Sequence, residues 1–132
     1  MSQENVEIVQ QSYEAFARRD FAAVLGLCSA DFELDIKAHP IPDFPNVGTG
    51  GEHLMRFFAT YLEGFSEYTL EVNQIIDAGD KVMAECHDTA RLGPGVVERD
   101  FAHVWTLDAG RIVRLEAFKA GGEALEAGGL SE

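Results

Sequence analysis

A histidine stands in an apolar strand pattern near the end of the sequence. The stretch RDFAHVWTLDAGRIVRLEAF (99–118) is typical of two strands joined by a tight turn, and it places His103 where a core strand usually carries an aliphatic residue. Because side chains alternate across a strand, His103 shares a face with Phe101 and Trp105. A desolvated imidazole is favoured in its neutral form, which can both donate and accept a proton. We therefore interpret His103 as a candidate acid/base residue, with a hydrogen-bonded core histidine as the alternative.

Two more polar residues flank the end of the first expected strand, where the mouth of a pocket should lie. Asp35 and His39 could supply an acid and a base there. Asp35 has the opposite parity to Ile36, so Asp35 faces water if Ile36 faces inward. His39 lies in a proline-rich loop, where a solvated histidine is the alternative interpretation. Both residues are candidates for catalysis beside His103.

Aromatic residues on the apolar faces of the expected elements are candidates for the walls of a pocket, with core packing as the alternative. They are Tyr13, Phe58, Tyr61, Phe101 and Trp105. The neighbours His87 and Asp88 suggest a dyad, but adjacent residues of a strand point to opposite faces. The four histidines are scattered without ligand spacing, so we expect no metal site and no cofactor.

The helices that must position these residues are expected in the first half of the chain. Apolar residues recur every three or four positions over 4–18, which predicts an amphipathic helix. Asp20 can cap a second, short helix. Thr49 and Glu52 have the spacing of a capping box that would open a third helix, and Gly64 is placed to end it.

The remainder of the chain alternates as strands do, and a short last helix at 123–127 is also expected. Turns this short, each with a glycine, require consecutive strands to pair antiparallel. Helices followed by strands indicate an α+β fold, a curved antiparallel sheet wrapped around three helices, with a conical cavity as the default ligand site. The expected strands are 32–37, 68–77, 81–91, 96–107 and 111–118.

Length and charge restrict the possible functions. With 132 residues the chain fits one domain, 1–132. Its 23 acidic and 10 basic residues give a net charge of −13, which disfavours nucleic acid and anionic membranes as partners. The N-terminal segment MSQENVEIVQ lacks a basic stretch followed by an apolar run, so we expect a cytoplasmic protein.

Two segments carry a family resemblance over essentially the whole chain. With the order helix, helix, strand, loop, helix and four strands, YEAFARRDFAAVLGLCSADFEL and FAHVWTLDAGRIVRLEAF resemble the SnoaL-like branch of the nuclear transport factor 2-like (ketosteroid isomerase-like) superfamily. The resemblance implies a cone-shaped fold and a homodimer formed through the outer face of the sheet. The superfamily includes isomerases, polyketide cyclases, epoxide hydrolases, dehydratases and noncatalytic proteins, so the fold does not give the function.

The functional residues of these relatives match this sequence only in part. On the isomerase pattern the base falls on Ile36 and the oxyanion tyrosine on Ser12, so both groups are missing, while the oxyanion aspartate falls on His103. The epoxide hydrolases resemble this fold too, but their aspartate-arginine-aspartate relay is not met, because Phe101 stands two residues after Arg99. For the cyclases, His103 could fill the acid or base role.

Two classes of function follow from these observations. The first is a SnoaL-like isomerase, cyclase or hydrolase for an apolar, oxygen-bearing small molecule, with His103 as proton donor or acceptor. The second is a noncatalytic domain that uses the same pocket to bind a small hydrophobic ligand, or that serves in dimerisation. A cone filled by phenylalanine and tryptophan would leave no pocket of the roughly 300 Å³ that a ligand requires.

Overall fold

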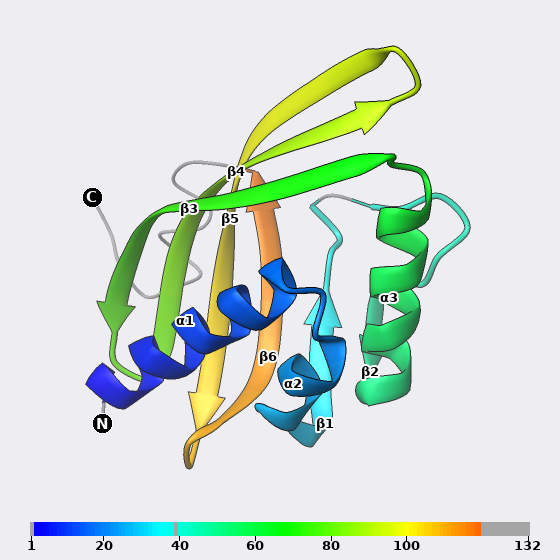
Figure 1. The fold of residues 1–132 in the computed structure, drawn as a ribbon. Coiled ribbons are helices and arrows are strands. Elements are labelled where there is room, and N and C mark those ends of the chain that lie inside the picture. Colours follow the sequence, from blue (N-terminus) through cyan, green and yellow to red (C-terminus); the bar gives the residue numbers. More distant parts are fainter. Residues whose placement is uncertain (1, 39, 120–132) are drawn as a thin grey trace.

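The computed structural model describes residues 2–38 and 40–119, which form three helices and one six-stranded sheet (Figure 1). The helices are α1 (Ser2–Ala17), α2 (Phe21–Gly26) and α3 (Gly51–Glu63). The strands are β1 (Cys28–Asp35), β2 (Val47–Thr49), β3 (Glu67–Ala78), β4 (Lys81–Leu92), β5 (Gly95–Asp108) and β6 (Arg111–Lys119). None of these three helices is long and apolar enough to cross a membrane.

The sheet has the strand order β2-β1-β6-β5-β4-β3. The strands β3 to β6 form an antiparallel meander, as the short turns predict. β1 pairs in parallel with β6, so the sheet is mixed and the expectation of a purely antiparallel sheet is wrong at this pair. The two strands are not consecutive in the chain, so no hairpin fixes their relative direction. The predicted α+β cone is otherwise confirmed.

The helices lie on one face of the curved sheet and close it into a cone. α1 runs across β3 to β6, while α2 and α3 lie near β1 and β2 (Figure 1). The core between these layers is apolar, and Val9, Phe32, Leu54 and Ile112 are each at most 2% exposed. Burial of this face stabilises the fold and leaves the opposite face of the sheet uncovered by these helices.

The helix boundaries follow the predicted signals at Asp20 and at Gly64, which is the C-cap of α3, and depart from them at Thr49. Asp20 caps α2, because its carboxylate accepts a hydrogen bond from the amide of Ala23 at 3.2 Å. The capping box at Thr49 is wrong, since Thr49 belongs to β2 opposite Glu33. Gly50 is the N-cap of α3 instead, with a φ of 89° that favours glycine.

The last hairpin shows why its turn carries the sequence Asp-Ala-Gly. Ala109 and Gly110 have φ angles of 50° and 78°, which is the left-handed backbone that a two-residue hairpin turn requires. The turn begins the pairing of β5 with β6, and a register shift between Thr106 and Leu107 then brings His103 opposite Ala117. Neither His39 nor the last helix expected at 123–127 can be compared, because both lie outside the described residues.

The proline-rich loop before α3 packs against that helix through a histidine. The rings of Phe44 and His53 lie 5.0 Å apart between centroids. Gly48 passes so close that a Cβ atom added to it would come within 2.5 Å of the His53 ring. The buried Nε2 of His53 has no hydrogen-bond partner among the described residues. Burial, and secondarily the charge of Arg56, lowers the pKa of His53 below its usual value of 6.5.

We expect acid to weaken this packing. A histidine whose pKa is lowered by folding binds its proton more readily in the unfolded chain, so its contribution is complete above about pH 6.5 and is lost below it. The free energy of unfolding in urea should therefore fall between about pH 7 and about pH 5 more steeply in the wild type than in His53→Phe. An equal decrease in both proteins would contradict the assignment to His53.

Candidate functional site

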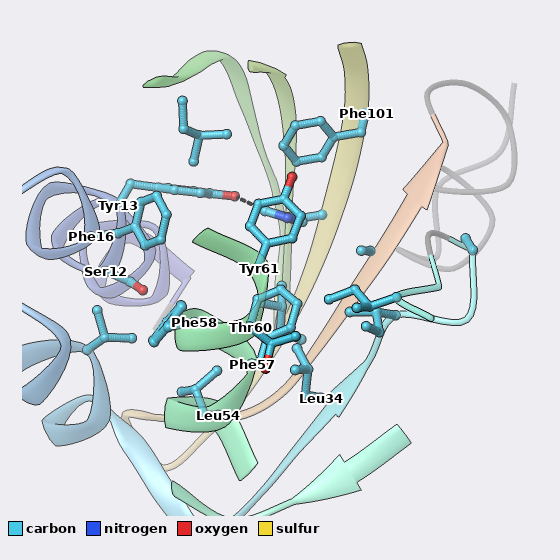
Figure 2. A pocket seen from close by; sticks show the side chains of 18 of the residues that line it. Ser12, Tyr13, Phe16, Leu34, Leu54, Phe57, Phe58, Thr60, Tyr61 and Phe101 are labelled. Atoms are coloured by element: carbon cyan, nitrogen blue, oxygen red, sulfur yellow. Dashed lines mark hydrogen bonds between the residues drawn. The ribbon is translucent and has the colours of Figure 1, made fainter. Parts of the chain in front are cut away.

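A cavity of about 580 Å³ lies inside the cone, between α1, α3 and the sheet. Its volume exceeds the roughly 300 Å³ of a typical ligand site, so the cone is not filled by its own side chains. Side chains from α1, α3 and β5 converge on this space (Figure 2). The lining includes His103 and the five aromatic residues predicted as pocket walls, which are Tyr13, Phe58, Tyr61, Phe101 and Trp105.

His103 belongs to a hydrogen-bonded group that joins α1 to β5. The hydroxyl of Tyr13 lies 2.7 Å from Nδ1 of His103 and accepts a hydrogen bond from Nε1 of Trp105 at 2.9 Å. Figure 2 shows this hydroxyl of Tyr13 reaching from the helix toward the sheet. We refer to Tyr13, His103 and Trp105 as the His103 network.

The donors and acceptors of this network favour one tautomer of His103. The indole N–H of Trp105 can only donate, so the Tyr13 oxygen accepts there. The Tyr13 O–H then has Nδ1 of His103 as its closest acceptor, while the sulfur of Cys86 is farther away at 3.7 Å. With Nδ1 as acceptor, the hydrogen of the neutral ring is on Nε2.

The chemistry of Tyr13 is that of a neutral phenol. Burial, and secondarily the nearby Cys86, raises the pKa of Tyr13 well above its usual value of 10. Tyr13 therefore keeps its proton at neutral pH and orients the His103 ring by hydrogen bonding. An imidazole can both donate and accept a proton, so His103 is the residue of this network suited to acid/base chemistry.

A second polar group in the cavity wall is centred on Arg99. The Nε and Nη2 atoms of Arg99 donate to the two carboxylate oxygens of Asp88 at 3.2 and 2.8 Å. The hydroxyls of Tyr68 and Tyr61 donate to the same carboxylate at 2.7 and 3.0 Å, and Arg99 also donates to the Tyr61 hydroxyl. We refer to these four residues as the Arg99 network.

The protonation states of the Arg99 network follow from these contacts. Burial opposes the charge of Asp88, which is only 1% exposed, but hydrogen bonds from Arg99 and Tyr68 outweigh it and hold the pKa of Asp88 below its usual value. The bond to Asp88 raises the pKa of Arg99, and burial raises the pKa of Tyr61. At neutral pH the network is one carboxylate, one guanidinium and two neutral phenols.

Asp88 was not predicted as a site residue. The sequence suggested it only as a partner of the adjacent His87, and adjacent strand residues point to opposite faces. His87 does point to the other face, where its ring lies 2.8 Å from a carboxylate oxygen of Asp100 and 3.0 Å from one of Glu98. Asp88 instead lies directly across from Arg99 in the β4–β5 pairing. The LGPG turn pairs Leu92 with Gly95, and the same register pairs Asp88 with Arg99. This contact could therefore have been predicted from the sequence.

Asp35 is not one of the described residues that line the cavity. Its carboxylate accepts a hydrogen bond from Arg114 at 3.2 Å and one from the amide of Lys37 at 3.0 Å. The expectation that Asp35 faces water is wrong, because Arg114 from the neighbouring strand covers it and leaves it 7% exposed. Its position gives no support to a role in acid/base chemistry.

The two positions on which the isomerase base and tyrosine fall, Ile36 and Ser12, both line the cavity. The base is therefore replaced by an alkyl side chain at a position that a substrate could contact. Among the described residues, no group of three or more histidine, cysteine or acidic side chains could hold a metal ion.

Comparisons with known proteins agree on the fold. Residues 9–115 match the family model of the SnoaL-like domain. An NTF2-like protein from Burkholderia thailandensis is 30% identical, with 85% of this chain and 87% of that chain covered and a TM-score of 0.73. No curated protein matches.

Two other solved structures share the fold at lower identity. TerC, co-crystallised with polyporic acid, is 23% identical, with 89% and 92% of the two chains covered and a TM-score of 0.80. A protein with a ketosteroid isomerase-like fold from Catenulispora acidiphila, in complex with trimethylamine, is 19% identical, with 94% and 93% covered and a TM-score of 0.73.

The tautomer of His103 can be observed directly. Long-range ¹H–¹⁵N spectra at a pH where the ring is neutral should show Nδ1 unprotonated and the hydrogen on Nε2, because Tyr13 donates to Nδ1. In Tyr13→Phe this donor is lost, and we expect the tautomer populations to change while His87, on the other face, keeps its spectrum. A neutral wild-type ring with its hydrogen on Nδ1 would contradict the hydrogen-bond assignment.

The Arg99 network predicts a large difference between a single and a double substitution. Arg99→Met leaves the buried carboxylate of Asp88 without its cation, and we expect a loss of about 3 kcal/mol in the free energy of unfolding. The double variant Arg99→Met/Asp88→Asn buries no unpaired charge and should lose much less. Urea unfolding measures both, and equal losses would contradict the pairing.

Proposed function

The chain belongs to the SnoaL-like domain family, and from this premise and the cavity we propose that it is a small-molecule enzyme. It binds an apolar, oxygen-bearing substrate inside the cone, and His103 exchanges a proton with that substrate in an isomerisation, cyclisation or hydrolysis. The observation that carries the proposal is the His103 network, a hydrogen-bonded imidazole in the wall of an otherwise largely apolar cavity.

The hydrogen bonds of the His103 network give each of its residues a different role. Tyr13 holds the ring of His103 through Nδ1, and Trp105 holds Tyr13, so the imidazole keeps one orientation. A neutral ring with its hydrogen on Nε2 is a hydrogen-bond donor suited to an oxygen that becomes more negative during the reaction. Tyr13 and Trp105 are positioning residues in this proposal.

Small-molecule binding is also supported by two structural neighbours. TerC was co-crystallised with polyporic acid, and the protein from Catenulispora acidiphila is in complex with trimethylamine. These ligands differ in chemistry, so they support a binding cavity in this fold rather than a particular substrate.

The second candidate function is noncatalytic binding of a hydrophobic molecule. The observation that favours it is that no aspartate or glutamate lines the described wall of the cavity, and the isomerase base position holds Ile36. A general base would then have to be His103 itself or water. The two candidates differ in whether bound molecules turn over.

Three expectations about the surroundings of the domain stay predictions. They are a single domain over 1–132, a homodimer through the outer face of the sheet and a cytoplasmic location.

Turnover in variants of His103 separates the two functions. We expect the wild type to exchange the α protons of 2-tetralone, hydrolyse dihydrocoumarin or open styrene oxide, followed by NMR in D₂O or water. His103→Gln should slow the accepted reaction by about 100-fold, since general acid–base groups typically contribute that much or more. His87→Gln, a histidine on the opposite face of the sheet, is the matched control and should keep the wild-type rate.

Equal rates in His103→Gln and the wild type would overturn the proposed role of His103. Binding of all three probes without any turnover would favour the noncatalytic function. The fluorescence of Trp105, the single tryptophan of the chain, reports that binding.

A further inference from the structure

The charged residues of the cavity wall have one sign. Arg99 and Lys119 are the charged residues among the described lining, which contains no aspartate or glutamate. This contrasts with the whole chain, in which 23 acidic residues outnumber 10 basic ones. The Asp88 carboxylate lies behind Arg99 and is not part of the described lining, so the charged groups that the lining presents to the cavity are cations and suit an anion.

Arg99 is held in a fixed orientation while part of its guanidinium remains available. Its Nε and Nη2 groups are engaged by Asp88 and Tyr61. The two N–H groups of Nη1 donate to no acceptor among the described residues, and the side chain is 39% exposed. A guanidinium fixed on one edge can accept an anionic oxygen on the other without losing much side-chain entropy.

Lys119 has a different position from Arg99. It lies at the end of β6 and is exposed, so a flexible ammonium can add to the local potential without fixing an orientation. Arg99 is therefore the group that would determine where an anion sits.

Each of the two polar networks of the cavity includes a residue of β5. Arg99 and His103 are four residues apart on the same face of β5, which separates their Cα atoms by about 13 Å. Phe101 lies between them on that face and contributes an apolar surface to the cavity. A molecule that touches both networks therefore has a flat or elongated apolar body.

We propose that the ligand of this cavity is an apolar organic acid whose carboxylate pairs with Nη1 of Arg99 while its body extends past Phe101 toward His103. This proposal extends the proposed function. It rests on that function in one respect, namely that this cavity is the ligand site. The alternative is that Arg99 serves only to neutralise Asp88, in which case an acid has no advantage over a neutral analogue.

The test compares 4-biphenylcarboxylate with 4-biphenylcarboxamide, which has the same shape and no charge. Binding to the full chain is followed by the fluorescence of Trp105 at about 0.15 M salt, where repulsion by distant surface charges is largely screened. We expect the acid to bind the wild type roughly tenfold more tightly than the amide, as a charged hydrogen bond provides.

The variant is Arg99→Met/Asp88→Asn, which removes one charge of each sign and leaves the net charge of −13 unchanged. We expect this variant to bind acid and amide equally. The matched control is Arg91→Met/Glu67→Gln, which removes an exposed ion pair between β4 and β3 and should keep the wild-type preference. Circular dichroism checks that both variants fold.

The proposal is overturned if the wild type binds acid and amide equally, if the preference survives in Arg99→Met/Asp88→Asn, or if neither probe binds at millimolar concentration. Because this measurement needs no turnover, its failure leaves the role of His103 standing. Conversely, a His103→Gln variant that reacts normally leaves the acid preference in place.

Discussion

A polar side chain inside an apolar cone needs a hydrogen-bond partner, because an unpaired buried donor or acceptor loses its hydrogen bonds to water. Both polar groups of this cavity satisfy that constraint. Tyr13 is shared by Trp105 and His103, and the Asp88 carboxylate is shared by Arg99 and two tyrosines. The partners come from different elements, so their hydrogen bonds also hold α1 and α3 in place against the sheet around the cavity.

The sequence predicted those parts of the cavity that depend on local periodicity. The alternation along β5 put Arg99, Phe101, His103 and Trp105 on one face, and all four line the cavity. Contacts between segments distant in the sequence were not predictable in this way. The burial of Asp35 by Arg114 depends on the parallel pairing of β1 with β6, which no turn specifies. Thr49 likewise matched a local capping signal, but its place in the β2 ladder prevailed.

The relatives share the backbone of this chain and leave its chemistry open. At identities below a quarter, a similar cone shows a similar fold and nothing about the groups inside it. The positions that line the cone decide what a bound molecule meets. Here Ile36 and Ser12 stand where an isomerase would carry its base and its tyrosine, while His103 and Arg99 lie four residues apart on the cavity face of β5.

The His103 network and the Arg99 network have no hydrogen-bonding residue in common. Sites without shared partners respond to substitution almost independently. A lineage of such proteins could therefore replace the residues at one end of the cavity while the other end keeps its geometry. Reactivity and ligand preference would then diverge as separate traits, and one cone could yield many different proteins by a few exchanges along β4 and β5.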